Sequence, residues 1–119
     1  MAYDSHNVFS KILRKEIPCQ PFYEDDFVLS FSDLNPLAPV HLLIIPKNNY
    51  ISFDDFSEKA SSEELAGFFS AIGKIAKKAN VSQSGYRLIT NHGEDAHQEV
   101  PHFHVHLLAG KPLGSILES

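Results

Sequence analysis

Apolar and polar residues recur along the chain with two different periods, one typical of helices and one typical of strands. Between Ser61 and Asn80 the apolar residues return every three or four positions, which predicts one long helix. Ser61 and Glu64 at its start fit a capping box, in which a hydroxyl and a carboxylate each bind a free backbone N–H. Apolar residues at helical spacing predict a short helix over residues 8–16, which the prolines that follow would end.

The rest of the chain is dominated by strand-like runs separated by turns. Residues 22–33 are predicted to form a hairpin, and residues 48–56 are expected to be irregular with at most one helical turn. The other predicted strands cover residues 40–45, 86–90 and 103–108. This order predicts an α+β fold with a five-stranded antiparallel sheet, one short helix and one long helix, in a single domain over residues 1–119.

Composition narrows the partners that the chain can bind. The formal net charge of -5 argues against a nucleic-acid polymer, since such binding depends on clustered Lys and Arg, but it permits a single nucleotide. A single cysteine, Cys19, allows no internal disulfide and is typical of a cytosolic protein. The polar start of the chain predicts no signal peptide, and no apolar run approaches the roughly 18 residues of a membrane helix. We therefore expect a cytoplasmic protein without membrane segments.

The candidate chemistry lies in residues 102–108, His-Phe-His-Val-His-Leu-Leu, where three histidines alternate with apolar residues. On a strand, successive side chains point to opposite faces. The three imidazoles, of His102, His104 and His106, therefore share one face, and the apolar side chains between them share the other. Since the apolar face is expected to enter the core, the histidines are directed together away from it.

Two interpretations of this motif involve no phosphate chemistry. The histidines could form the polar outer face of a half-buried strand, although Thr, Lys or Glu are more usual there. They could also bind zinc, for which His-x-His on a strand supplies a workable pair of ligands. However, a rise of about 3.3 Å per residue places the Cα atoms of His102 and His106 about 13 Å apart. All three imidazoles could hardly reach one ion, and a further ligand such as His41 would be needed.

Phosphate chemistry is the third interpretation. Imidazole is a good nucleophile towards phosphorus near neutral pH, because a pKa near 6.5 leaves much of it neutral. A central histidine can attack while its neighbours donate hydrogen bonds to phosphate oxygens or protonate the leaving group. The wide spacing that hinders chelation suits this chemistry, since each imidazole can contact a different part of a nucleotide.

The motif His-φ-His-φ-His-φ-φ, with φ apolar, resembles in full the signature of the histidine triad (HIT) family. A wider resemblance, closest to the Hint-like branch of nucleoside phosphoramidases and related nucleotidyl hydrolases, covers nearly the whole chain. It is carried by residues 9–12 (FSKI), 15–18 (KEIP), 22–26 (FYEDD) and 38–47 (APVHLLIIPK), and by Gly85-Tyr86-Arg87 leading to Asn91. The resemblance implies a HIT-like fold and a homodimer with the long helix and the sheet in its interface.

The activity that the resemblance implies is hydrolysis of a nucleoside 5′-phosphoramidate or a similar purine nucleotide conjugate. Within the family, the alternative is a dinucleoside polyphosphate hydrolase. Outside the enzymes, the alternative is a nucleotide-binding regulatory or scaffold protein with little turnover.

The resemblance also assigns roles to individual residues. His104 matches the nucleophile that forms a nucleotidyl-histidine intermediate, and His106 matches the residue that contacts the phosphate and assists the leaving group. His102 would help to set the geometry, and His41 would extend the histidine network. Asp33 matches the carboxylate that accepts hydrogen bonds from the ribose hydroxyls. On residue type alone, His41 could instead be a hydrogen-bonded core residue, and Asp33 could instead be a turn residue before Asn35-Pro36.

Further matched positions concern the rest of the nucleotide. Asn91 matches a residue near the ribose and the phosphate, and Gln98 and Glu99 lie where the family contacts the phosphate. The apolar slot that holds the base is matched by five residues: Val8, Phe9, Ile12, Ile17 and Leu43. Three histidines outside the motif are expected on the surface without a role: His6, His92 and His97.

The chain departs from the family at three places. Relatives with a structural zinc site carry Cys-x-x-Cys and a later His where this chain has Asn7, Ser10 and Asn49, so we expect no metal site and no cofactor. Glu99 stands where close eukaryotic relatives have Ser, and its carboxylate repels a phosphate unless it is protonated or turned away. Residues 114–119 lack the Trp-containing tail that shapes the pocket across the dimer in some relatives. The last two departures bear on leaving-group and substrate specificity.

Overall fold

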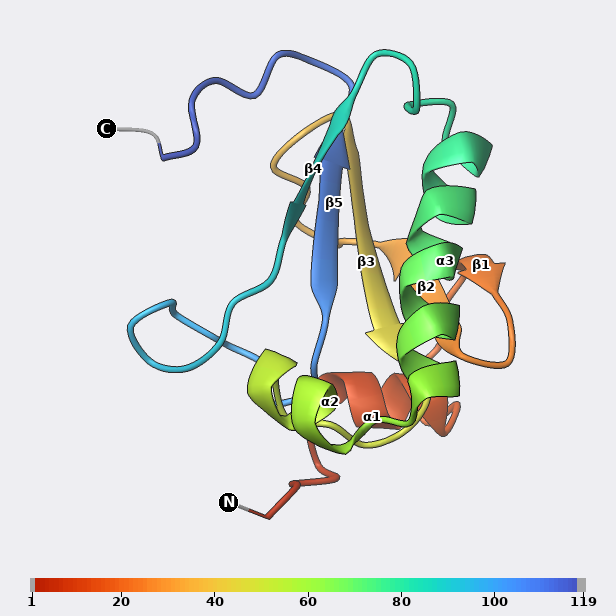
Figure 1. The fold of residues 1–119 in the computed structure, drawn as a ribbon, viewed down its shortest axis with the longest axis vertical. Helices are drawn as coiled ribbons and strands as arrows, with labels where there is room; N and C mark the ends of the chain where they lie inside the picture. Colours follow the sequence, from red (N-terminus) through yellow and green to blue (C-terminus); the bar gives the residue numbers. More distant parts are fainter. Residues whose placement is uncertain (1, 118–119) are drawn as a thin grey trace.

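The computed structural model describes residues 2–117, which form five strands and three helices (Figure 1). The strands are β1 (Pro21–Glu24), β2 (Val28–Ser32), β3 (Val40–Pro46), β4 (Tyr86–Ile89) and β5 (Val105–Ala109), and the helices are α1 (Val8–Leu13), α2 (Phe53–Lys59) and α3 (Ser62–Lys78). The strands form one antiparallel sheet in the order β1-β2-β3-β5-β4. The predicted α+β fold with a five-stranded antiparallel sheet is confirmed. Within the described residues, no helix is long and apolar enough to cross a membrane.

Apolar side chains pack on both faces of the sheet. On one face, α3 (green in Figure 1) runs along the strands, and its Phe68 and Ile75 pack with Leu107 of β5. On the opposite face, a smaller cluster joins Phe9 of α1 to Leu43 of β3. Because side chains alternate along a strand, the histidines of β3 and β5 share the α1 side with Leu43. The sheet thus separates the main core from the face that carries the candidate chemistry.

Two of the helices correspond to those predicted from periodicity. Ser61 is the N-cap of α3, and the predicted capping box is confirmed by reciprocal hydrogen bonds between Ser61 and Glu64. Asn7 caps α1 through its side-chain oxygen. This helix ends at Leu13, earlier than predicted, because Lys15 adopts a left-handed φ of 64° that turns the chain away from the helix axis.

Helix α2 differs from the prediction, which expected residues 48–56 to be irregular with at most one helical turn. Ser52 occupies its N-cap position, while Asp54 and Asp55 in the first turn and Lys59 in the last turn suit the helix dipole. A helix of 7 residues is too short to show a helical period. In the sequence, α2 is therefore indicated by the charged residues at its ends and not by the spacing of its apolar residues.

Strand β5, which carries the histidine motif, begins later than predicted. Regular pairing starts at Val105, because the N–H of Phe103 donates instead to the carbonyl of Tyr50 at 2.7 Å. His102 and His104 therefore precede the strand. The predicted alternation nevertheless continues through this segment: Phe103 and Val105 enter the core under α3, while the rings of His102 and His104 contact α1 on the opposite side.

Candidate active site

A cavity of about 470 Å³ opens on the α1 side of the sheet beside the histidine motif. Eight of the residues that the sequence indicated line it: Phe9, Asp33, His41, Leu43, Asn91, Glu99, His104 and His106. Seven residues without an expected role complete the lining: Asn35, Leu37, Ile89, Ala96, His97, Val100 and Leu108. The wall thus combines α1, the β2–β3 loop, three strands and the loop that precedes β5.

His104 lines the cavity, but only 7% of its surface is exposed. Its Nδ1 lies 2.7 Å from the carbonyl oxygen of His102, which can only accept a hydrogen bond. The ring proton therefore resides on Nδ1, and Nε2 carries a lone pair. Burial lowers the pKa of His104 below its usual value of 6.5, so the ring is neutral and Nε2 is nucleophilic near neutral pH.

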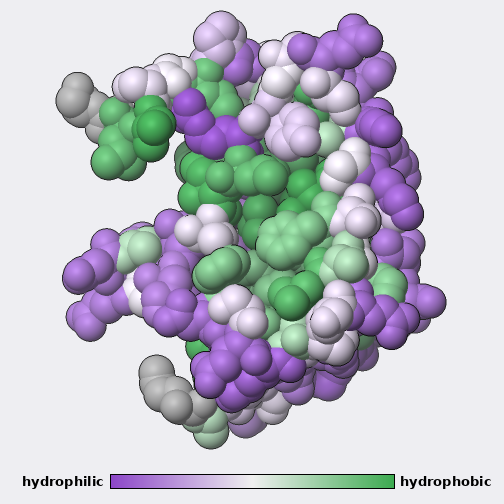
Figure 2. Space-filling model, in the orientation of Figure 1, coloured by the Kyte–Doolittle hydropathy of each residue, from purple (hydrophilic) through white to green (hydrophobic). Residues whose placement is uncertain are grey.

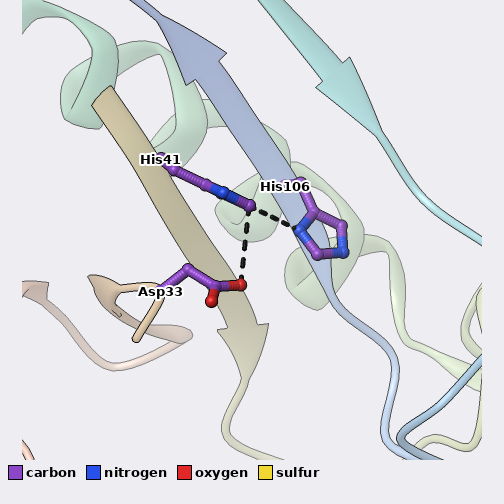
Figure 3. Close-up of side chains that lie close together, drawn as sticks. All are labelled: Asp33, His41 and His106. Atoms are coloured by element: carbon purple, nitrogen blue, oxygen red, sulfur yellow. Dashed lines mark hydrogen bonds and ion pairs between the residues drawn. The ribbon is translucent and has the colours of Figure 1, made fainter. Parts of the chain in front are cut away.

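Two directed hydrogen bonds fix the protons of His41 and His106 (Figure 3). The N–H of Leu37 donates to Nδ1 of His41 at 3.0 Å, so His41 holds its proton on Nε2. This Nε2–H points at Nδ1 of His106, 2.9 Å away, and lies 3.5 Å from Oδ2 of Asp33. His106 consequently carries its own proton on Nε2. Burial and the neighbouring imidazoles lower the pKa of His106 to about 4, so this ring is also neutral.

His104 and His106 present unlike nitrogens to one cavity. Their ring centroids lie 5.2 Å apart. The first ring offers a lone pair, and the second offers an N–H donor. A nucleophile beside a hydrogen-bond donor suits attack on a phosphate, because the donor can bind a phosphate oxygen or protonate the leaving group.

His102 is fully buried and does not line the cavity. Its Nε2 lies 3.0 Å from the carbonyl oxygen of Pro46, and its Nδ1 bonds to the hydroxyl of Tyr3. Burial lowers the pKa of His102 to about 4. Because His102 and His104 are buried, the interpretation of the motif as the polar outer face of a strand is wrong. His102 instead contributes to the site through its backbone carbonyl, which accepts a hydrogen bond from Nδ1–H of His104.

The donor atoms of the histidine cluster do not fit a metal ion. Both ring nitrogens of His102 are occupied by protein partners, so the three motif histidines cannot share one ion. Ligand atoms of Asp33, His41 and His106 do lie within 4.8 Å of one another. A metal at Nε2 of His41 would, however, move its proton to Nδ1, where it would face the N–H of Leu37. The hydrogen-bond pattern therefore suits proton placement better than chelation.

Two of the three positions at which some relatives carry zinc ligands form the N-terminal cap of α1 in this chain. Asn7 Oδ1 accepts the N–H of Ser10 at 2.9 Å, and Asn7 Nδ2 donates to the carbonyl of Asp4 at 2.8 Å. The third position, Asn49, is exposed. Amide and hydroxyl groups are poor ligands for zinc, and the amide of Asn7 is already engaged. These residues do not fit a structural zinc site.

Asp33 is a turn residue and also lines the cavity. Its Oδ1 accepts the N–H of Asn35 at 2.8 Å, which is the contact of a turn residue. Its Oδ2 faces His41, and the side chain lines the cavity. One carboxylate oxygen therefore holds the turn, while the other is placed to accept a hydrogen bond from a ligand.

Some polar side chains of the loop before β5 line the cavity, and others form hydrogen bonds to nearby backbone groups. Gln98 lies outside the cavity lining: its Oε1 accepts the N–H of Gly93 at 3.0 Å, and its Nε2 donates to two backbone carbonyls. Asn91 and Glu99 do line the cavity. Glu99 is exposed, and its carboxylate lies 3.1 Å from Nε2 of His97. The hydrogen bonds of Gln98 thus stabilise the loop, whereas Glu99 pairs with His97 at the edge of the cavity.

The residues expected to hold the base are divided among three environments. Phe9 and Leu43 line the cavity, whereas Ile12 and Ile17 line a separate cavity of about 580 Å³ beside β1. Val8 is 41% exposed and lines neither. A helix turns about 100° per residue, so neighbouring side chains of α1 face different directions. Ile12 still packs against the cluster of Phe9 and Leu43, from behind the cavity lining.

Several residues at the site carry no signal in the sequence. Leu37 and Ile89 add apolar lining from two separate segments, whereas Leu108 lies on the histidine face that the alternation of the motif already indicates. His97, which was expected on the surface without a role, is exposed but also lines the cavity. Tyr3 reaches His102 from the segment before α1. Apart from that of Leu108, none of these placements follows from a local pattern, because each depends on how distant segments meet.

Comparisons with known proteins agree with this fold. The family model of the HIT domain matches residues 14–113. A HIT-like protein of Azospirillum brasilense is 50% identical over 115 residues, which cover 97% of this chain and 94% of that protein. The purine nucleoside phosphoramidase of Escherichia coli strain K12 is 43% identical over 110 residues, or 92% of each chain. A solved HIT family hydrolase from Clostridium thermocellum aligns with a TM-score of 0.88 and 40% identity, covering 96% of this chain and 99% of its own. The chain belongs to the HIT family.

Proposed function

We propose that this protein is a hydrolase that cleaves nucleoside 5′-phosphoramidates, or related purine nucleotide conjugates, through a covalent intermediate on His104. The observation that carries the proposal is the pair of opposite proton states in one cavity, the lone pair on Nε2 of His104 and the N–H on Nε2 of His106. The substrate class is supported by the Escherichia coli relative, which is named a purine nucleoside phosphoramidase.

In the first step, Nε2 of His104 attacks the α-phosphorus of the bound substrate. A bond forms between phosphorus and Nε2 while the bond between phosphorus and the leaving nitrogen breaks. The leaving nitrogen takes a proton from solvent and departs as a neutral amine, while Nε2–H of His106 donates a hydrogen bond to a phosphate oxygen and the ring stays neutral. His104 holds the nucleotidyl group, and its Nδ1–H remains bonded to the carbonyl of His102, which stabilises the positive charge on the ring.

In the second step, water attacks the phosphorus of the intermediate. The proton that this water loses passes to solvent, and the bond between phosphorus and His104 breaks. A nucleoside monophosphate leaves, and Nε2 of His104 regains its lone pair. His41 keeps Nδ1 of His106 occupied throughout, so Nε2–H of His106 stays directed at the phosphate.

The remaining cavity residues would bind the nucleotide. Oδ2 of Asp33 is placed to accept hydrogen bonds from the ribose hydroxyls, and Asn91 can bond to the ribose or the phosphate. Phe9 and Leu43 offer an apolar surface to the base. Apolar contacts with the ring faces favour any flat base, so selection between purines is expected to be weak.

A homodimer is part of the proposal, and an exposed apolar face supports it. Figure 2 shows apolar side chains gathered on the face that carries α3 and the edge strand β4. Phe53, Phe69, Leu88 and Ile89 are between 37% and 49% exposed there and line a shallow cavity. An exposed apolar edge strand favours association, because its backbone N–H and C=O groups also lack partners. The dimer would therefore pair the β4 edges and the α3 faces of two copies.

A direct test is rapid acid quench during turnover of adenosine phosphoramidate labelled at the α-phosphate. We expect the label on the peptide that contains residues 102–106 in the unmodified protein, and no label after His104→Ala. This substitution should lower turnover by several orders of magnitude while the affinity for adenosine monophosphate changes little, because the rest of the cavity remains. A reaction that stops with a chelator and leaves no label on this peptide contradicts the proposed nucleophile.

The same preparation separates the alternative functions. Steady-state turnover of adenosine phosphoramidate and diadenosine polyphosphate should be measured side by side, and we expect a higher kcat/KM for the phosphoramidate. Preference for the polyphosphate would assign the chain to the other hydrolase class. Tight nucleotide binding with negligible turnover of both substrates would favour a regulatory or scaffold protein.

A further inference from the structure

A chain of hydrogen bonds joins the segment before α1 to His102, and the mechanism proposed above makes no use of it. Asn7 Nδ2 donates to the phenol oxygen of Tyr3 at 3.0 Å, and the hydroxyl of Tyr3 lies 2.5 Å from Nδ1 of His102. On the other side of the ring, Nε2 lies 3.0 Å from the carbonyl oxygen of Pro46. Both nitrogens of a fully buried imidazole thus have partners within the protein.

The direction of each bond follows from its partners. The carbonyl of Pro46 can only accept, so neutral His102 holds its proton on Nε2. Nδ1 is then an acceptor, and the hydroxyl of Tyr3 must donate to it. The oxygen of Tyr3 accepts from Asn7, whose own side-chain oxygen accepts the N–H of Ser10. The direction of every hydrogen bond in this network is thus determined, and only the Nε2-protonated tautomer of His102 satisfies all of these bonds.

This network of hydrogen bonds continues to His104, the nucleophile of the proposed mechanism. The backbone carbonyl of His102 accepts Nδ1–H of His104 at 2.7 Å. An imidazole held at both nitrogens limits the rotation of the His102 side chain and thereby the orientation of its carbonyl. Without the hydroxyl of Tyr3, Nδ1 of His102 is a buried acceptor that has lost its partner, which favours movement of the ring away from its present position.

We propose that Tyr3 is a positioning residue for His104, acting through the tautomer and orientation of His102. The inference rests on the proposed function, since it concerns the same nucleophile. Tyr3 is absent from the residues that line the cavity, so it does not contact the substrate. Its hydroxyl instead keeps the carbonyl of His102 in position to accept a hydrogen bond from Nδ1–H of His104. Nε2 of His104 then retains its lone pair.

The test is Tyr3→Phe, which removes the hydroxyl and keeps the ring that packs edge-on against His102. We expect kcat for adenosine phosphoramidate to fall about tenfold to hundredfold, as for a nucleophile displaced by a fraction of an ångström. The affinity for adenosine monophosphate should stay within about twofold, because no cavity residue changes. The matched control is Tyr23→Phe, which also removes a partly buried hydroxyl, one that donates to Asp25 away from the cavity. The control should keep the kcat of the unmodified protein.

A second measurement reads the tautomers directly and needs no substrate. In ¹⁵N-histidine NMR spectra of the unmodified protein, Nδ1 of His102 and Nε2 of His104 should have the shifts of unprotonated nitrogens. Tyr3→Phe should give both rings mixed tautomers, whereas a merely structural role would lower the thermal midpoint and leave the shifts and kcat unchanged. An Nδ1-protonated His102 in the unmodified protein overturns the inference.

A second variant covers the case in which Tyr3→Phe does not fold. Asn7→Asp keeps the oxygen that caps α1 but replaces the amide donor with a carboxylate that competes for the proton of Tyr3. It should lower kcat and alter the His102 shifts in the same direction as Tyr3→Phe. Unchanged kcat and unchanged shifts in a folded Asn7→Asp protein count against the inference.

Failure of the inference and failure of the proposed function give different results. If the unmodified protein has no turnover, or His104→Ala retains it, the proposed mechanism fails, and the NMR tautomers still decide whether Tyr3 orients His102. If turnover depends on His104 but Tyr3→Phe matches Tyr23→Phe in kcat, the role of Tyr3 is wrong and the mechanism stands.

Discussion

Nε2–H of His41 points at Nδ1 of His106 across 2.9 Å, and this contact determines which nitrogen of His106 carries a proton. His41 can donate from Nε2 because its Nδ1 accepts the backbone N–H of Leu37 at 3.0 Å. A backbone group in the β2–β3 loop thus sets the proton pattern of a side chain on β5. The N–H that His106 presents to the cavity therefore depends on a loop that is distant from it in the sequence.

Replacing His41 by Ala should reduce kcat about tenfold to hundredfold, because Nδ1 of His106 loses its donor and the proton can occupy either nitrogen. Adenosine monophosphate binding should change far less, since His104 and Asp33 remain in the cavity. The control is His41→Gln, whose side-chain amide can still donate towards His106 and should recover part of kcat. Equal kcat values for both variants and the unmodified protein would show that this contact does not orient the N–H of His106.

Stability should fall as the pH decreases from about 6.5 to about 4. Burial lowers the pKa of His102 from 6.5 to about 4 in the folded protein, so in this window the unfolded chain binds a proton that the folded chain does not. For one such group the free energy of unfolding at pH 5 should be about 2 kcal/mol lower than at pH 7.5. Urea denaturation at a series of pH values measures this slope.

A matched pair of variants assigns that slope. His102→Gln removes one titrating group and should make the slope shallower, while His104 and His106, whose pKa values burial also lowers, still contribute to it. The variant should also be less stable at pH 7.5. Gln83→Asn, at an exposed position whose side chain does not titrate, should leave the slope unchanged. If both variants retain the full slope, other groups that titrate in this range account for it.

The sequence predicted the sheet, the long helix and the face shared by the histidines because each depends on a local period. The capping box of Ser61 and Glu64 is a further local signal, and it is confirmed. The bounds of α1 were less predictable, since the left-handed turn at Lys15 uses a residue that does not indicate one. Local patterns thus give the elements more reliably than the positions at which they end.

The site was predictable only as far as the motif and the resemblance reach. His104 and His106 line the same cavity, but their proton states depend on a carbonyl and on His41, and no sequence pattern encodes these contacts. The exclusion of Ile12 and Ile17 from the cavity lining likewise depends on the rotation of α1 and the path of the chain after it. Contacts between distant segments therefore decide which matched residues face the cavity.

The proposed dimer should dissociate when a charge enters the apolar face. Leu88 on the edge strand β4 is 45% exposed, and Phe69 on α3, which lines the same shallow cavity, is 49% exposed. Leu88→Glu would bury an unpaired carboxylate in the interface, so light scattering should give the mass of one chain, 13.3 kDa, in place of two. Leu34→Glu, at a 95% exposed position outside this face, should remain dimeric. A monomeric unmodified protein would contradict the dimer.

Asp33→Ala should weaken ribonucleotides more than their 2′,3′-dideoxy analogues. Oδ2 is the oxygen proposed to accept from the ribose, and a hydrogen bond to a charged group contributes about 1.5–3 kcal/mol, or roughly tenfold to a hundredfold in affinity. Asp33→Asn separates this role from the turn, because its amide oxygen can still accept the N–H of Asn35 while the charge is lost. Calorimetric titration with adenosine monophosphate and its dideoxy analogue should therefore show the same selective loss in both variants, larger for Ala. If Asp33→Ala weakens both ligands equally and Asp33→Asn weakens neither, the carboxylate serves the turn and not the sugar.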